Sequence, residues 1–368
     1  MINNLMLIKI KQIFFILSKK EKNSFYLLIF LMLIGSFLEA VGLGLIIPFI
    51  SVIVDSDSLK NFTFIPLTIN EYIFSLEIKM RIIYFSILIL GFYLFKNIFI
   101  GFLYYKINTF AFGSRSSISN RLFNLYLNKN YNFFMKTNSS KLISNIHNET
   151  GVYCEQALIS ILTMLTEILL ILTISLFLLI YNPKITIIVF IIIFVISSIF
   201  QILTKPFIMK WGLQRQKSDQ DKFKILSQGF GGIRELKIFD KLEYFKKKFE
   251  KSNNLLGKVS GYHATLQNIP KLYLELTAIV SFITIIIIIV LTANDISKLI
   301  TILSLYGVAA FRMLPSANKV IHSQQNIRFS TVSIERLYQE FNDTDEKDNY
   351  INTKLNDIPE SWEKLVFD

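Results

Sequence analysis

IVFIIIFVISSIF at residues 188–200 and IVSFITIIIIIVL at residues 279–291 are apolar on every face of a helix. A helix of that composition lies either in a membrane or fully buried inside a large protein. Six such apolar stretches occur along the chain, and each reaches or approaches the roughly 20 residues that cross a bilayer core. The sequence therefore predicts an all-α, polytopic membrane protein with six transmembrane helices. The predicted spans are residues 25–54, 82–108, 155–180, 185–206, 269–291 and 299–321.

Composition agrees with a membrane location. Hydrophobic residues make up 52% of the 368 residues and charged residues only 18%, whereas soluble domains carry about 25% charged residues. Cys154 is the single cysteine, which excludes an internal disulfide framework and most cysteine-based metal sites. The three histidines have no ligand spacing. We therefore expect no metal site and no catalytic residue in this chain.

The positive charges are distributed unevenly between the links. Most of the 39 Lys and Arg residues fall in the N-terminal segment, the second and fourth links and the C-terminal tail. Positive charge marks the cytoplasmic side of a membrane protein, so we expect both termini in the cytoplasm. This bias accounts for the formal charge of +12, and we expect no nucleic-acid partner.

The N-terminal segment, residues 1–24, is not typical of a cleaved signal. The apolar stretch that follows is about 30 residues long and contains Glu39, whereas a signal peptide has an apolar core of about 7–15 residues. Apolar residues at helical spacing alternate with lysines and indicate an amphipathic helix on the inner membrane surface; they are Ile10, Ile13, Phe14 and Leu17. The alternative is a disordered basic leader.

The links between the predicted spans differ strongly in length. Residues 181–184 and 292–298 form short links, but residues 109–154 and 207–268 form long ones. The long links continue the helical period of the spans, with apolar residues such as Ile118, Leu122 and Leu125 on one face. Helices that continue for some 25 residues would project roughly 37 Å into the cytoplasm. The sequence therefore predicts two cytoplasmic arms, each a helical hairpin.

This layout, with four segments in the same order, resembles the transmembrane domain of ABC exporters. The resemblance covers nearly the whole chain and is closest to the subgroup that flips lipid-linked oligosaccharides and related polysaccharide precursors. The four segments match the elbow helix with the first span, the first arm, the second arm, and the exit of the sixth span with its connector. They are residues 17–53, 131–149, 229–253 and 312–341.

The resemblance implies a homodimer whose two copies enclose a cavity. It also implies that each arm ends in a short coupling helix docked on a nucleotide-binding domain, one near Asn132–Lys136 and the other near Phe239–Glu243. The alternative for these apolar faces is packing of one arm against the other. The residues assigned to coupling are Asn132, Phe133, Phe134, Phe239, Asp240 and Lys241.

The sequence contains no phosphate-binding loop of the form GxxxxGK[ST], the glycine-rich cradle of nucleotide phosphates. We therefore expect no ATP hydrolysis by this chain and no cofactor bound to it. SWEKLVFD at residues 361–368 resembles the first strand of the nucleotide-binding domain. The expected organisation is residues 1–24 as elbow helix, 25–335 as transmembrane domain and 336–368 as connector and first strand of a missing domain. ATP and Mg²⁺ are implied for that domain, encoded in cis or in trans.

Ionisable residues inside spans are costly, which makes them candidates for function. The candidates for the substrate cavity are Arg312, Glu39, Lys96 and Glu167. Arg312 is the best candidate to bind an anion, because a guanidinium grips phosphate bidentately and stays charged; the alternative is that it extends to the interface. For Glu39 the alternative is a pair with a lysine on another helix. Lys271 and Glu275 are predicted to form a local pair.

The favoured interpretation is the translocating part of an ATP-driven flippase in the inner (plasma) membrane of a bacterium. Its expected substrate is an amphipathic lipid-linked oligosaccharide or polysaccharide precursor. The first alternative is an exporter of another lipid, a peptide or a drug. Alternatives of another class are a membrane anchor or sensor whose arms bind a cytoplasmic partner, and a nonfunctional fragment.

Overall fold

The computed structural model describes residues 9, 11–54, 78–181, 183–292 and 296–345, and nearly all of them are helical. The predicted all-α fold is confirmed. The long elements are α2 (Lys19–Val54), α4 (Ile78–Leu127), α8 (Ile159–Tyr181), α9 (Pro183–Gly231), α11 (Leu242–Thr292), α12 (Ile296–Phe329) and α13 (Thr331–Asp345). The short ones are α5 (Tyr131–Lys136), α6 (Ser139–Ser144), η2 (Asn145–Glu149), α7 (Thr150–Val152), η3 (Tyr153–Leu158) and α10 (Ile233–Ile238), where η2 and η3 are π-helical.

Three of the helices are far longer than a bilayer requires. Helices α4, α9 and α11 contain 50, 49 and 51 residues, against about 20 for a transmembrane segment. Each therefore continues well beyond its apolar part, as predicted for the arms. Within the described residues, the stretches Lys19–Leu45, Ile82–Leu127 and Ser139–Ile180 are long and apolar enough to span a membrane. The count of six spans stays a prediction.

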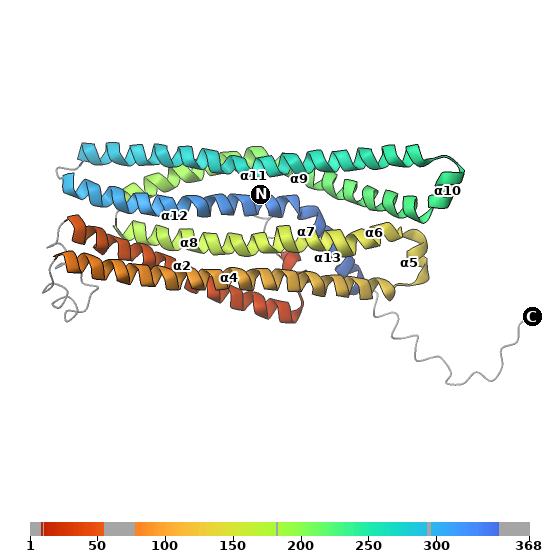
Figure 1. The fold of residues 1–368 in the computed structure, drawn as a ribbon, viewed down its shortest axis with the longest axis horizontal. Helices are drawn as coiled ribbons and strands as arrows, with labels where there is room; N and C mark the ends of the chain where they lie inside the picture. The colour runs from red at the N-terminus through yellow and green to blue at the C-terminus, as the bar shows by residue number, and fades with distance from the viewer. Residues whose placement is uncertain (1–8, 10, 55–77, 182, 293–295, 346–368) are drawn as a thin grey trace, which may run out of the picture.

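The long helices run nearly side by side and make an elongated molecule (Figure 1). Helices α9 and α11 form one hairpin joined by α10, and α4 returns through α5 and α6 towards α8. The turns at α5 and α10 lie at the same end of the molecule, opposite the end where α8 stops and α9 begins (Figure 1). Helix α12 packs on α8 and also contacts α11 and α9. The tips of the two arms therefore lie at the same end of the molecule.

The N-terminal helix packs into the main hydrophobic core. Ile13 and Ile16 are fully buried, and their carbonyl oxygens accept hydrogen bonds from the Tyr153 hydroxyl at 3.0 Å and the Arg121 guanidinium at 2.7 Å. The predicted amphipathic helix is present over residues 11–16, but its apolar face covers α4 and η3. Its apolar face is therefore buried against protein, and its place on the inner membrane surface stays a prediction.

A capping box separates this helix from α2. The Ser18 N–H donates to the Glu21 carboxylate at 2.6 Å, and the Glu21 N–H donates to the Ser18 hydroxyl at 3.3 Å. This reciprocal pair satisfies two N–H groups that the first turn of a helix leaves free. As a result α2 begins at Lys19, earlier than the apolar stretch from residue 25 suggested.

The turn of the second arm differs from the expectation. The short helix is α10, Ile233–Ile238, and Phe239, Asp240 and Lys241 form the turn that follows it. Asp240 has a φ of 52°, a left-handed conformation that ends a helix. The Lys241 N–H then donates to the Leu236 carbonyl at 3.0 Å. The predicted helix at Phe239–Glu243 is therefore shifted towards the N-terminus. The first arm agrees, since α5 covers Asn132, Phe133 and Phe134.

Candidate transport site and coupling surfaces

Glu39 on α2 binds cations from two other helices. One carboxylate oxygen accepts from the Lys96 ammonium of α4 at 3.0 Å, and the other accepts from the Arg312 guanidinium of α12 at 2.6 Å. Lys96 also lies over the Tyr93 ring, 4.1 Å from its centroid. Glu39 and Lys96 are both buried. Three helices are thus joined by one carboxylate in an apolar region.

Glu167 on α8 forms a second ion pair beside the first. It accepts from the Lys319 ammonium of α12 at 2.7 Å, and Lys319 also donates to the Tyr104 hydroxyl at 3.1 Å. The second carboxylate oxygen of Glu167 is buried without a hydrogen-bond partner among the described residues. Glu39, Tyr104, Glu167 and Arg312 line one small cavity between α2, α4, α8 and α12. We call these residues with Lys96 and Lys319 the charged seam.

The charged seam contains three basic and two acidic side chains. Its carboxylates are almost completely buried, whereas the side chains of Arg312 and Lys319 are 28% and 41% exposed. The accessible charge of the seam is therefore positive. An anion that approached α12 would meet these two cations before it met either carboxylate.

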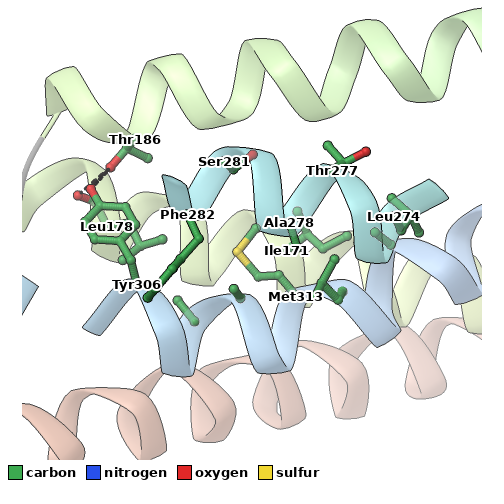
Figure 2. A pocket seen from close by; sticks show the side chains of 14 residues that line it. Ile171, Leu178, Thr186, Leu274, Thr277, Ala278, Ser281, Phe282, Tyr306 and Met313 are labelled. Atoms are coloured by element: carbon green, nitrogen blue, oxygen red, sulfur yellow. Dashed lines mark hydrogen bonds between the residues drawn. The ribbon is translucent and has the colours of Figure 1, made fainter. Parts of the chain in front are cut away.

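An apolar cavity lies on another face of α12. Its volume is about 110 Å³, and its walls come from α8, α9, α11 and α12. The side chains that point into it are mostly aliphatic or small, with a hydrogen bond between Thr186 and Tyr306 at one end (Figure 2). Arg312 of the seam precedes Met313 of the cavity wall in the sequence. A charged site and an apolar site therefore share one helix.

The tips of the arms carry exposed apolar side chains. Tyr131 and Met135 on α5 are exposed, and Ile238 and Phe239 at the end of α10 are also exposed. Phe133 is different, because its ring packs against Tyr126 with centroids 6.2 Å apart. Both tips therefore present large apolar side chains that the described part of the chain does not cover.

The sequence model of the ABC transporter transmembrane region matches residues 25–313. The chain belongs to this family. It is the transmembrane part of an ABC exporter, lies in a membrane and works with a nucleotide-binding domain. The matched region of this ABC exporter contains Glu39, Lys96, Glu167 and Arg312 together with both arm tips, while Lys319 and α13 lie beyond it.

The structure brings together every residue that the sequence predicted for the substrate cavity of the ABC exporter. Glu39, Lys96, Glu167 and Arg312 all lie in the charged seam, and Glu39 pairs with a lysine of another helix as its alternative stated. Lys319 was missed. It follows Arg312 by seven residues, two helical turns, and so lies on the same face of α12. Lys271 and Glu275 form a local pair at 4.0 Å, and both side chains are exposed.

A second buried ionic cluster of the ABC exporter lies between the arms. Arg215 on α9 donates to Glu149 of η2 at 3.4 Å, to Asp219 at 3.0 Å and to the Ser333 hydroxyl of α13 at 2.8 Å. Asn148 donates to Asp219 at 2.8 Å. The first arm, the second arm and α13 therefore meet at one guanidinium. We call these five residues the arm cluster, and sequence reasoning did not find it.

The joint between α12 and α13 lies next to the arm cluster. The Phe329 ring stacks on His263 of α11, with centroids 3.9 Å apart and an interplanar angle of 11°. Burial first, together with the charges of His322 and Arg215, lowers the pKa of His263 to about 4. The imidazole is therefore neutral at physiological pH. Gly212 of α9 faces the Phe329 carbonyl, where an added Cβ would lie 2.5 Å from the oxygen.

Proposed function

We propose that this ABC exporter flips a lipid-linked oligosaccharide or polysaccharide precursor. The observation that carries the proposal is the charged seam, in which Arg312 and Lys319 lie on one face of α12 and remain partly exposed. A pyrophosphate between a lipid and a sugar is a strong anion with several acceptor oxygens. Two cations spaced two turns apart on a helix can bind such a group, and the guanidinium can do so bidentately.

The carboxylates of the charged seam would help the site to release its ligand, because they compete with it for the same cations. Glu39 and Glu167 hold Arg312 and Lys319 when no anion is bound, at 2.6 Å and 2.7 Å. An incoming pyrophosphate would compete with these carboxylates for the same donors. A ligand shifts a conformational equilibrium only through different affinities for the two states. Movement of α12 relative to α2 and α8 would change this competition, and therefore the affinity.

The source of energy lies outside the seam. In this proposal, ATP and Mg²⁺ bind a nucleotide-binding domain, and that domain docks on the exposed tips at α5 and at the turn after α10. A homodimer would place two seams around one cavity. The termini and the tips would lie in the cytoplasm of a bacterium, beneath its inner membrane. The support is the clustering of both tips at one end of the molecule (Figure 1) and the distribution of Lys and Arg.

A second candidate is export of an uncharged apolar lipid or drug. The apolar cavity between α8, α9, α11 and α12 favours this function. It predicts that the affinity for substrate does not depend on Arg312 or Lys319.

Binding of a short-chain polyprenyl pyrophosphate by the purified transporter tests the proposal. The matched ligand is the polyprenol of the same chain length, which lacks the charge. We expect Arg312→Ala to weaken pyrophosphate binding at least tenfold and to leave polyprenol binding unchanged, while Arg312→Lys restores part of it. Lys271→Ala is the control, because Lys271 is an exposed cation on α11. Equal binding of the pyrophosphate by Arg312→Ala and the parent would refute the proposal.

A further inference from the structure

The apolar cavity arises from small side chains where four helices meet. Ala278 of α11 and Ala309, Ala310 and Ala317 of α12 leave space that larger residues would fill, with Met313 at its centre (Figure 2). It lies between the α8–α12 pair and the α9–α11 hairpin. Every lining residue falls within the predicted spans, so the cavity lies at the depth of the lipid chains.

The polar atoms in its walls are mostly satisfied by the protein. Thr186 donates to the Leu178 carbonyl at 3.0 Å and therefore accepts from the Tyr306 hydroxyl, which lies 2.7 Å away. Thr277 donates to the Tyr273 carbonyl at 2.6 Å. Ser281 is a lining hydroxyl without a hydrogen-bond partner among the described residues. A buried water needs two to four polar partners, so one hydroxyl does not hold water there.

We propose that this cavity binds the end of one hydrocarbon chain of a bilayer lipid. The lining contains no charged side chain, which excludes an ionic ligand because a desolvated charge needs a partner. A dry cavity of about 150 Å³ takes up a guest the size of benzene. At about 110 Å³, this cavity therefore accepts the end of a chain rather than a whole lipid. Lipid chains are the apolar groups that surround these spans at high concentration.

The bound chain contacts both the α8–α12 pair and the α9–α11 hairpin. Atoms that line an empty space lack partners for dispersion contacts, and a bound chain supplies them. The chain would then hold the α9–α11 hairpin against α8 and α12. This role does not depend on the transported substrate. It predicts that lipid composition affects the protein through a site that is separate from the charged seam.

Photolabelling of the complete protein in lipid vesicles tests this inference. The probe is a phosphatidylcholine with a diazirine at the end of one acyl chain, and mass spectrometry locates the labelled peptides. We expect label on residues 274–282 and 306–317. Ala278→Leu and Ala310→Leu fill the cavity and should reduce that label at least fivefold. Ala264→Leu is the control, because Ala264 is an exposed residue of the same helix, α11, outside the cavity.

A variant that enlarges the cavity gives the opposite expectation. Met313→Ala should increase labelling of the same two peptides at least twofold, which keeps the inference testable if a filling variant fails to fold. Label confined to lipid-exposed faces, or equal label in Ala278→Leu, Ala264→Leu and the parent, would overturn it. If the parent protein does not bind polyprenyl pyrophosphate but its cavity is still labelled, the flippase proposal fails and the lipid-chain inference stands.

Discussion

Arg215 of the second arm lies 3.4 Å from the carboxylate of Glu149 in the first arm, and both side chains are almost completely buried. The same guanidinium donates to Ser333 of α13. The three segments are far apart in the sequence, so this cluster fixes their relative positions. The joint keeps the two arms and α13 in register.

Removing Arg215 should strongly destabilise the protein. Arg215→Ala leaves the buried Glu149 carboxylate without its cation, and breaking a buried pair in this way costs about 3–5 kcal/mol. The matched control is Arg115→Ala. Its pair with Glu155 is 2.5 Å long, but the two side chains are 32% and 46% exposed, so the expected loss is about 0–1 kcal/mol. Thermal unfolding in detergent measures the stability of the two variants. Equal decreases in Tm would show that the buried pair of Arg215 stabilises the protein no more than the exposed pair of Arg115.

Gly212→Ala should disturb the joint between α12 and α13. The new Cβ would lie 2.5 Å from the Phe329 carbonyl oxygen, and a backbone atom cannot move away as a side chain can. We expect destabilisation of about 1–3 kcal/mol, typical of overpacking. Gly257→Ala on α11 is the comparison, because no atom lies within 4 Å of its added Cβ. Since alanine favours helices, that variant should be neutral or more stable by about 0.5–1 kcal/mol. The same Tm for both would exclude a close contact at Gly212.

His263 should make the protein less stable in acid. Its pKa is lowered to about 4 in the folded state by burial first, whereas in the unfolded chain it is about 6.5. The folded state therefore binds fewer protons between these values. Its stability is complete above pH 6.5 and decreases as the pH falls towards 4. The expected loss between pH 6.5 and 5 is about 2 kcal/mol.

His263→Phe tests the acid sensitivity. The phenyl ring keeps the stacking on Phe329 but has no proton to bind. We expect the Tm of the parent to decrease between pH 7.5 and 5, and the Tm of the variant to change less over the same range. His322 faces the same region and stays in both proteins, so the difference reports His263 alone. Identical pH slopes would show that His263 does not titrate in this range.

The sequence predicted the membrane helices and most of the charged seam for one physical reason. A charge inside a bilayer is costly, so each charged residue of the seam needs a partner: Glu39 pairs with Lys96 and Arg312, and Glu167 pairs with Lys319. Lys319 was missed because it lies close to the predicted inner edge of α12, where a lysine is common. The same reasoning fails outside the bilayer. Arg215 and Glu149 stand among many charged residues of the arms, and only the three-dimensional structure shows that they are buried.

The turn of the second arm was misplaced for a local reason. Its position depends on Asp240 in the left-handed region, with a φ of 52°. Glycine is the usual residue for that conformation, and aspartate adopts it less often. Glycines stand at the bend before α10, at positions 229, 231 and 232, but the bend after α10 contains no glycine.

Phe239 in this turn should affect coupling rather than folding. Its side chain is 69% exposed, so Phe239→Ser should not change the Tm. If the turn docks on the nucleotide-binding domain, the loss of that apolar contact should reduce substrate-stimulated ATP hydrolysis by the complete transporter at least fivefold. Leu255→Ser is the control, because Leu255 is also exposed, on α11 away from the turn. A similar ATPase rate in the two variants would remove Phe239 from the docking surface.

Glu39→Gln separates the structural role of the charged seam from its role in binding. The amide keeps the shape of the side chain but removes the negative charge from Lys96 and Arg312, at 3.0 Å and 2.6 Å. Lys96 is buried, so its unpaired charge should lower the Tm. Arg312 is partly exposed, and without its carboxylate it should bind a polyprenyl pyrophosphate more tightly, by about tenfold for each 1.4 kcal/mol of lost competition. Stability and affinity should therefore change in opposite directions.

A double substitution identifies the cause of the lower Tm. In Glu39→Gln with Lys96→Met no unpaired cation is left at position 96, and replacing a buried pair by neutral groups is often tolerated. We expect this protein to regain most of the lost Tm and to keep the tighter binding, because Arg312 is still free of its carboxylate. If Glu39→Gln loses affinity in parallel with stability, the carboxylate does not compete with the ligand. Arg312 would then be a structural partner of Glu39 and not a substrate-binding residue.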